Sequence, residues 1–121
     1  MNIDMDIIDA FNLKDVTLLS DEHIANNSCP IFDNPGIPQE ELIPQYMLWV
    51  VKNGDHDGNL ICDGLLSDLA FLGRTKNSQL APFKYNLTGR QLAVVIEFIE
   101  WCKSNLVLSD EVVLKRLQKY W

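Results

Sequence analysis

The strongest constraint on the fold of this chain is the stretch LTGRQLAVVIEFIEWCKSNL, residues 87–106. Thr88 and Gln91 have the spacing of a capping box, in which a hydroxyl and an amide satisfy backbone groups at the start of a helix. Apolar residues then recur at helical intervals and predict one buried face, which Phe98 and Trp101 widen. This predicted face comprises Leu92, Val95, Ile96, Ile99 and Leu106. We therefore expect a long helix at 89–105, towards the C-terminus, as the centre of the core.

The segment IPQEELIPQYMLWVVKNG, residues 37–54, predicts a second buried region. Pro38 suits the first turn of a helix, where its missing N–H costs nothing. Pro44 lies too far along for that, so it should begin a second helix or kink the first. The residues after Pro44 are apolar almost all round, which indicates burial on every side. Gly54 is expected to mark the helix end.

Two further helices are predicted downstream. CDGLLSDLAFLGR (62–74) has Leu65, Leu66, Leu69 and either Phe71 or Leu72 at inward positions, with Gly73 as a stop. A final helix should follow a Ser109 cap, because Asp110 and Glu111 favour its positive end. Its inner face would consist of Val113, Leu114, Leu117 and Trp121.

The other segments give weaker signals. Residues 5–13 and 20–27 each favour a helical turn or two, and CPIFDNPG (29–36) reads as an extended stretch that enters a turn. Residues 74–87 form a polar, basic connection with Phe83 and Tyr85 as anchors. Because no segment shows strand alternation, the expected class is all-α.

A chain of 121 residues that is 47% hydrophobic suits one core. We expect a compact single-domain helical bundle of about five to six helices over residues 1–121. Within it, residues 1–36 would form a variable acidic N-terminal part, and residues 37–121 the helical core.

The charge of the chain is divided unequally. Residues 1–72 carry 13 acidic and 2 basic side chains, whereas residues 73–121 carry 4 acidic and 8 basic ones, and the net charge is −7. Nucleic-acid binders are normally basic, so this class is disfavoured. An acidic half suits a basic protein partner, because opposite potentials speed encounter. The alternative is that the acidic side chains only keep the protein in solution.

Several features indicate a cytoplasmic protein. The first residues, MNIDMDIIDAF, are acidic where a secretory signal would be basic. No apolar run approaches the roughly 18 residues that span a bilayer, so no membrane partner is expected. Cys29, Cys62 and Cys102 have no C-x-x-C spacing and are interpreted as small buried side chains.

The stretch NGDHDGNLICDG, residues 53–64, partly matches a calcium-binding loop. Asn53, Asp55 and Asp57 fall at the first three ligand positions, and they are the weak metal candidates of this chain. The position of the last ligand, normally a bidentate glutamate, holds Gly64. The alternative interpretation is a polar turn between two helices. We therefore assign no metal and no other cofactor.

Enzyme signatures are absent from the sequence. Neither histidine, His23 nor His56, belongs to a metal-binding or hydrolase motif. Cys29 lies six residues after His23, but the sequence offers no third group to orient such a base. We therefore expect a protein without enzymatic activity.

The segments IPQYMLWVV (43–51) and PFKYNLTGRQLAVVIEFIEW (82–101) resemble a family of small, largely uncharacterised bacterial proteins. That family has a proline-led apolar helix followed by a phenylalanine and a capped L-T-x-x-Q helix, and the resemblance covers roughly residues 37–102. Its members often look like small acidic immunity proteins encoded beside interbacterial toxins. The resemblance implies binding and blocking of a toxin, and it carries no catalytic residue.

Three functions remain open. The first is an immunity or antitoxin protein that neutralises a cognate toxin, for example a basic nuclease, by stoichiometric binding. The second is a calcium-responsive helical module built on residues 53–64, and the third is a small enzyme that uses Cys29 or His56. The first would place carboxylates against a basic cleft, with an exposed Phe32 or Tyr46 as the anchor. The candidate carboxylates are Asp33, Glu40, Glu41, Asp55, Asp57 and Asp63.

Overall fold

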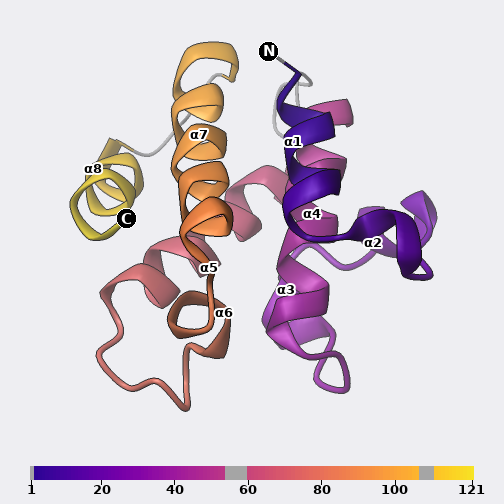
Figure 1. Cartoon of the computed structure of the whole chain (residues 1–121), viewed down its shortest axis with the longest axis horizontal. Helices are drawn as coiled ribbons and strands as arrows, with labels where there is room; N and C mark the ends of the chain where they lie inside the picture. Colours follow the sequence, from indigo (N-terminus) through magenta and orange to yellow (C-terminus); the bar gives the residue numbers. More distant parts are fainter. Residues whose placement is uncertain (1, 54–59, 107–110) are drawn as a thin grey trace.

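The computed structural model describes residues 2–53, 60–106 and 111–121, and every regular element within these ranges is a helix (Figure 1). The all-α class is therefore confirmed. The elements are α1 (Ile3–Ala10), the 3-10 helix η1 (Leu13–Asp15), α2 (Asp21–Ala25), α3 (Pro30–Asp33), α4 (Gln39–Asn53), α5 (Leu60–Arg74), α6 (Pro82–Tyr85), α7 (Gly89–Asn105) and α8 (Glu111–Tyr120). In Figure 1, α7 and α8 lie on one side of the molecule, and α2 and α3 lie on the opposite side.

The expected number of helices was too low, because two segments that were not expected to be helical, residues 29–36 and 74–87, each contain a short helix. Pro30 and Pro82 each occupy the first turn of a four-residue helix, α3 and α6. The fixed φ of proline suits the start of a helix as well as it suits a turn. The prediction that residues 29–36 begin as an extended stretch is therefore wrong.

The helix at the centre of the fold is α4. Its residues 42–48 are all buried, and it packs against α1, α2, α3, α5 and α6. One continuous helix passes through Pro44, so this proline does not begin a second helix. Pro44 removes one backbone hydrogen bond. Because packing supplies most of the stability of a helix in a protein, burial on all sides offsets that loss.

Helix α7 has the predicted capping box and bounds, but it is not the centre of the core. Gln91 N donates to Thr88 Oγ1 over 3.1 Å, and Thr88 N donates to Gln91 Oε1 over 3.0 Å. The helix packs chiefly on α1 and also contacts α8. Its buried face consists of Val94, Val95, Phe98, Ile99 and Cys102.

The predicted inner face of α7 is only partly correct. Leu92 and Ile96, which were expected inside, are 38% and 40% exposed. Apolar residues surround much of this helix, so its periodicity allows more than one buried face. The positions of α1 and α8 decide which face is covered.

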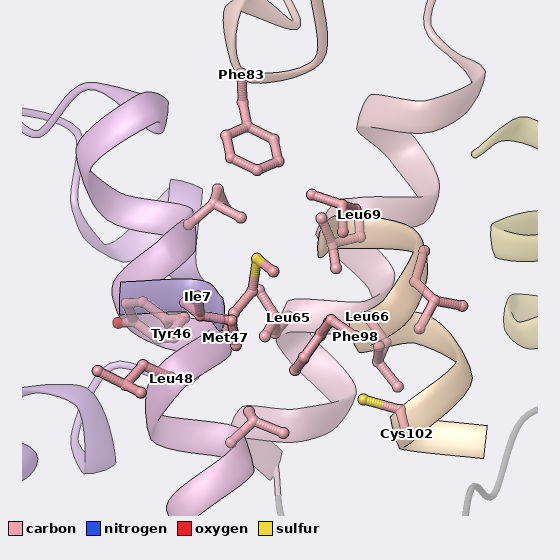
Figure 2. Packing of buried hydrophobic residues seen from close by; sticks show 14 of the residues in the cluster. Ile7, Tyr46, Met47, Leu48, Leu65, Leu66, Leu69, Phe83, Phe98 and Cys102 are labelled. Atoms are coloured by element: carbon pink, nitrogen blue, oxygen red, sulfur yellow. The ribbon is translucent and has the colours of Figure 1, made fainter. Parts of the chain in front are cut away.

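The core forms around α4 and α5. Figure 2 shows Met47 of α4, Leu65 of α5 and Phe98 of α7 pointing toward one another. In α5, Leu65, Leu66, Leu69 and Leu72 are buried as predicted, and Phe71 is the exposed alternative.

Gly73 does not end α5, which continues to Arg74. A Cβ at Gly73 would lie 2.6 Å from Nε1 of Trp121, so this glycine makes room for the indole ring. Trp121 Nε1 donates to the carbonyl oxygen of Leu69 over 2.8 Å. The α8 face is as predicted where it is described: Leu117 is buried, and Val113, Leu114 and Trp121 are half-buried. Gly54, Ser109 and Asp110 lie outside the described residues.

Helix α6 contacts residues near both ends of the chain, because its Phe83 packs against Phe11, which follows α1, and against Trp121, which follows α8. Phe83 is buried and stacks on Phe11 with centroids 5.9 Å apart, and it meets Trp121 edge-on at 6.1 Å. Phe83 is therefore an anchor, as expected. Tyr85 is more exposed, but its hydroxyl donates to the carbonyl oxygen of Thr75 over 2.8 Å. Among the helices described, none has both the length and the apolar character that crossing a bilayer requires.

Candidate functional site

The most exposed large hydrophobic side chain among the described residues is Phe32, at 85% of its full exposure. It belongs to the single turn of α3. A phenylalanine left this open to water loses the stabilisation that burial would provide. Exposed aromatic side chains on a fixed backbone are the usual anchors of protein interfaces.

Two carboxylates hold the backbone of this turn. Asp68 of α5 accepts a hydrogen bond from Ile31 N over 3.1 Å, and Asp33 accepts one from Cys29 N over 3.0 Å. Both bonds use backbone N–H groups at the start of a helix, which have no partner within the helix itself. The conformation that presents Phe32 is therefore fixed by contacts within the chain.

A buried polar network supports the turn from below. The Tyr46 hydroxyl donates to the carbonyl oxygen of Asn27 over 2.7 Å and accepts from Asn34 Nδ2 over 3.1 Å. Asn34 Oδ1 lies 2.7 Å from His23 Nε2, so the imidazole donates there. The network joins α2, the residues flanking α3, and α4. Its members satisfy one another, which makes such a network rigid.

Tyr46 was expected as an exposed anchor for a partner, and this expectation is wrong. Its side chain is fully buried. Burial raises the pKa of the Tyr46 phenol, an effect that its hydrogen bond with Asn34 opposes and the nearby Asp33 carboxylate reinforces. The phenol therefore stays protonated at neutral pH and keeps the proton that it donates to Asn27. Its role is to hold the turn that carries Phe32.

Among the residues that the structure describes, Asp33 on the turn and Asp68 of α5 have no cationic partner. Burial raises the pKa of Asp68, and the negative charge of Asp33 raises it further, while the hydrogen bond from Ile31 N lowers it. No lysine or arginine among the described residues forms an ion pair with either carboxylate. A positive charge brought to this turn would therefore relieve a repulsion between Asp33 and Asp68.

The remaining predicted residues are spread over separate elements. Asp33 lies on α3, Glu40 and Glu41 are exposed in the first turn of α4, and Asp63 is exposed in the first turn of α5. Asp55 and Asp57 lie outside the described residues, so the calcium-loop hypothesis stays untested. Asn53 Nδ2 donates to the carbonyl oxygen of Trp49 within α4. No group of three or more potential metal ligands occurs within the parts that the structure describes.

The structure places a third group beside the Cys29–His23 pair, since Asn34 contacts His23. However, no hydrogen bond joins the Cys29 thiol to His23 among the described residues. Cys29 is exposed, contrary to the expectation that all three thiols are buried. Cys62 and Cys102 are buried as expected, and burial raises the pKa of the Cys62 thiol to about 11 and that of Cys102 further still.

Sequence reasoning missed Asp68, Asn34 and Gly64 as parts of this site. Asp68 acts on a backbone group 37 positions away, which no local pattern reveals. Gly64 lies against the chain at Ser28, where a Cβ would overlap the Ser28 carbonyl oxygen. The local signal that was available is the acid Asp33 after Pro30, since acidic residues near a first-turn proline favour a helix start.

A second pair of neighbouring carboxyl groups consists of Asp6 on α1 and Glu97 on α7. This pair leads to a prediction about how stability depends on pH. Burial, together with the hydrogen bond and the negative charge of Asp6, raises the pKa of Glu97. The folded chain therefore binds this proton more tightly than the unfolded chain, and stability falls as pH rises through the raised pKa. Glu97→Gln removes the charge. Above that pH range it should raise the free energy of unfolding by a few tenths of a kcal/mol, roughly the size of like-charge effects on helices.

Chemical unfolding between pH 4 and pH 8 measures this difference. At the acid end the wild type and Glu97→Gln should be equally stable, because the wild-type carboxyl is then neutral as well. Glu100→Gln, an exposed neighbour on the same helix, is the control and should show no such convergence. A gap between wild type and Glu97→Gln that stays constant with pH would contradict the pairing with Asp6.

The fold and the site define an all-α protein whose most exposed aromatic side chain stands on a turn fixed by a buried polar network. No family model, no curated protein and no solved structure matches this chain.

Proposed function

We propose that the chain is a bacterial immunity protein, which neutralises a cognate toxin by binding it stoichiometrically. The observation that carries this proposal is the 85% exposed Phe32 on the α3 turn. An apolar ring held open to water on a rigid backbone is suited to burial in a partner. Because its backbone is already ordered, little conformational entropy is lost when the partner binds.

The charge of the chain supports a basic partner. Thirteen of its 17 acidic side chains lie in residues 1–72, the part that contains α1 to α4 and most of α5. Asp33 and Asp68, which hold the turn of Phe32, lack an ion pair among the described residues. A toxin with a basic cleft, such as a nuclease, would meet these carboxylates and associate quickly. Such binding would also block the cleft.

Co-expression tests the proposal. Each reading frame that neighbours this gene is expressed in a bacterial host, alone and together with this chain. The expected result is that one neighbour stops growth when it is expressed alone, and that growth resumes when this chain is present. The purified pair should then form a 1:1 complex. The proposal fails if no neighbour is toxic, or if a toxic neighbour still kills with this chain present.

Phe32→Ala should weaken the complex by about 100-fold, the effect of losing a central aromatic anchor. Its own stability should change by less than about 0.5 kcal/mol, since the ring is exposed. Phe71→Ala is a matched control, because Phe71 is an exposed phenylalanine of α5, and it should leave the affinity unchanged. Titration calorimetry measures the dissociation constant of each variant for the toxin. Equal affinities for the two would show that Phe32 is not the anchor.

A further inference from the structure

A second feature of the surface is a hollow of about 160 Å³ where the ends of several helices meet. It lies beside the residue that follows α1, the first turn of α4, the end of α6 and the first turn of α7. Its lining consists of Phe11, Glu40, Phe83, Asn86, Leu87 and Gln91. Pockets for small-molecule ligands are usually about 300–1,000 Å³, so this hollow suits a single side chain better.

The walls of the hollow are fixed by contacts within the chain. Phe11 and Phe83 stack with their planes 21° apart. Gln39 accepts a hydrogen bond from Phe83 N over 3.2 Å and so ties α6 to the start of α4. On the other side, Gln91 Nε2 donates to the carbonyl oxygen of Ala10 over 3.1 Å. The hollow is therefore formed before any partner arrives.

The lining combines aromatic rings with one negative charge. Glu40 is exposed and forms no ion pair or side-chain hydrogen bond with the residues that the structure describes. Asn86 adds a polar side chain to the lining. None of the described residues that line the hollow is basic. Aromatic faces attract cations, and the carboxylate supplies the stronger attraction.

Lysine and arginine side chains match this lining. Each has an aliphatic stem that packs on apolar or aromatic surface and a cationic end that needs an acceptor. We propose that the hollow receives a lysine or arginine side chain of the protein partner, with the stem against the half-buried Phe11 and the charge at Glu40. This inference rests on the proposed function for the existence of a partner, and it adds a second contact point to the Phe32 turn.

The first test needs no partner. The ¹⁵N-labelled chain is titrated with n-butylammonium, n-butylguanidinium or the neutral n-butanol and followed by two-dimensional NMR. We expect saturable shifts of the Gln91 side-chain amide and the Phe83 backbone amide with the two cations, at millimolar concentration because the probes are small. n-Butanol should give no comparable shifts.

Glu40→Gln and its neighbour Glu41→Gln make a matched pair, because both residues are exposed in the first turn of α4 and only Glu40 lines the hollow. Glu40→Gln should weaken cation binding by about tenfold or more, the loss of a charge-assisted contact. Glu41→Gln should bind as the wild type does. Equal effects of the two, equal shifts with butanol, or no shifts at all would overturn the proposal. Submicromolar binding of a probe would also overturn it, since it would indicate a small-molecule site.

The second test uses the toxin found by co-expression. Glu40→Gln should weaken the complex by about tenfold, and Glu41→Gln should not. If Phe32→Ala weakens the complex while Glu40→Gln does not, the hollow is not part of the interface and the proposed function still stands. If no toxin is found, the proposed function fails, and with it the assignment of the occupant, whatever the cation titration shows.

Discussion

Replacing Gly64 by alanine should destabilise this protein more than the same substitution at Gly36, Gly73 or Gly89. A Cβ at Gly64 would overlap the carbonyl oxygen of Ser28 and would lie 3.0 Å from the Ser28 carbonyl carbon. Both atoms belong to the backbone, which cannot turn aside as a flexible side chain can. Helix α5 and the segment before α3 would have to separate. We expect a loss of about 3 kcal/mol or more, the upper range for overpacking.

Thermal and urea unfolding of Gly64→Ala measure this loss, with an expected fall in Tm of roughly 10 °C. Gly89→Ala is the control, because nothing lies within 4 Å of a Cβ at that position in the first turn of α7. Alanine there should raise stability by up to about 0.5 kcal/mol through the unfolded chain. Similar stabilities for Gly64→Ala and the wild type would show that α5 does not lie this close to Ser28.

The same substitution connects the core to the candidate site. Ser28 immediately precedes Cys29 and Pro30, where α3 begins. Displacement of this segment should disturb the hydrogen bond between Ile31 N and Asp68. Gly64→Ala should therefore also weaken binding of the toxin, at a temperature where the variant is still folded. Phe32→Ala should weaken binding without this loss of stability, so the two variants separate positioning from contact.

Trp121→Ala should lower the free energy of unfolding by about 2–3 kcal/mol. This is less than the cost of truncating a fully buried tryptophan, because Trp121 is half-buried. Its indole meets Phe83, donates to Leu69 O and has the Lys84 ammonium 5.7 Å from its ring. Lys84 also donates to the carbonyl oxygen of Gly73. These contacts hold the end of α8 against α5 and α6.

Hydrogen exchange distinguishes this effect from a general loss of stability. In Trp121→Ala, amides of α8 should exchange faster than amides of α4, because α8 loses the hydrogen bond from Trp121 to Leu69 of α5. Tyr120→Ala is the matched control, since that ring is exposed and has the Lys119 ammonium 5.2 Å from its centroid. It should cost less than about 0.5 kcal/mol. Equal effects of the two substitutions would mean that the indole does not anchor α8.

The candidate site was predictable in part. Four of the predicted carboxylates lie at or near the surface, namely Asp33, Glu40, Glu41 and Asp63. Phe32, one of the two aromatic residues predicted to be exposed, is exposed. Tyr46 lies in the apolar run after Pro44, so the sequence itself favoured its burial over a role as an exposed anchor. The difference between Tyr46 and Phe32 arises from neighbours: α1, α2, α3, α5 and α6 pack around α4, whereas Phe32 on α3 is left 85% exposed.

The sequence by itself determined the features that depend on residues a few positions apart. The capping box set the start of α7, apolar spacing indicated the all-helical class, and the continuous apolar run predicted the burial of α4. These effects are local, since caps and helical periodicity act over one or two turns. Only the tertiary structure decided which face of α7 is covered, why Gly64 and Gly73 must be glycines, and that Asp68 holds the turn of Phe32. Each of these depends on side chains or backbone brought together from distant parts of the chain, and burial is a property of that assembly.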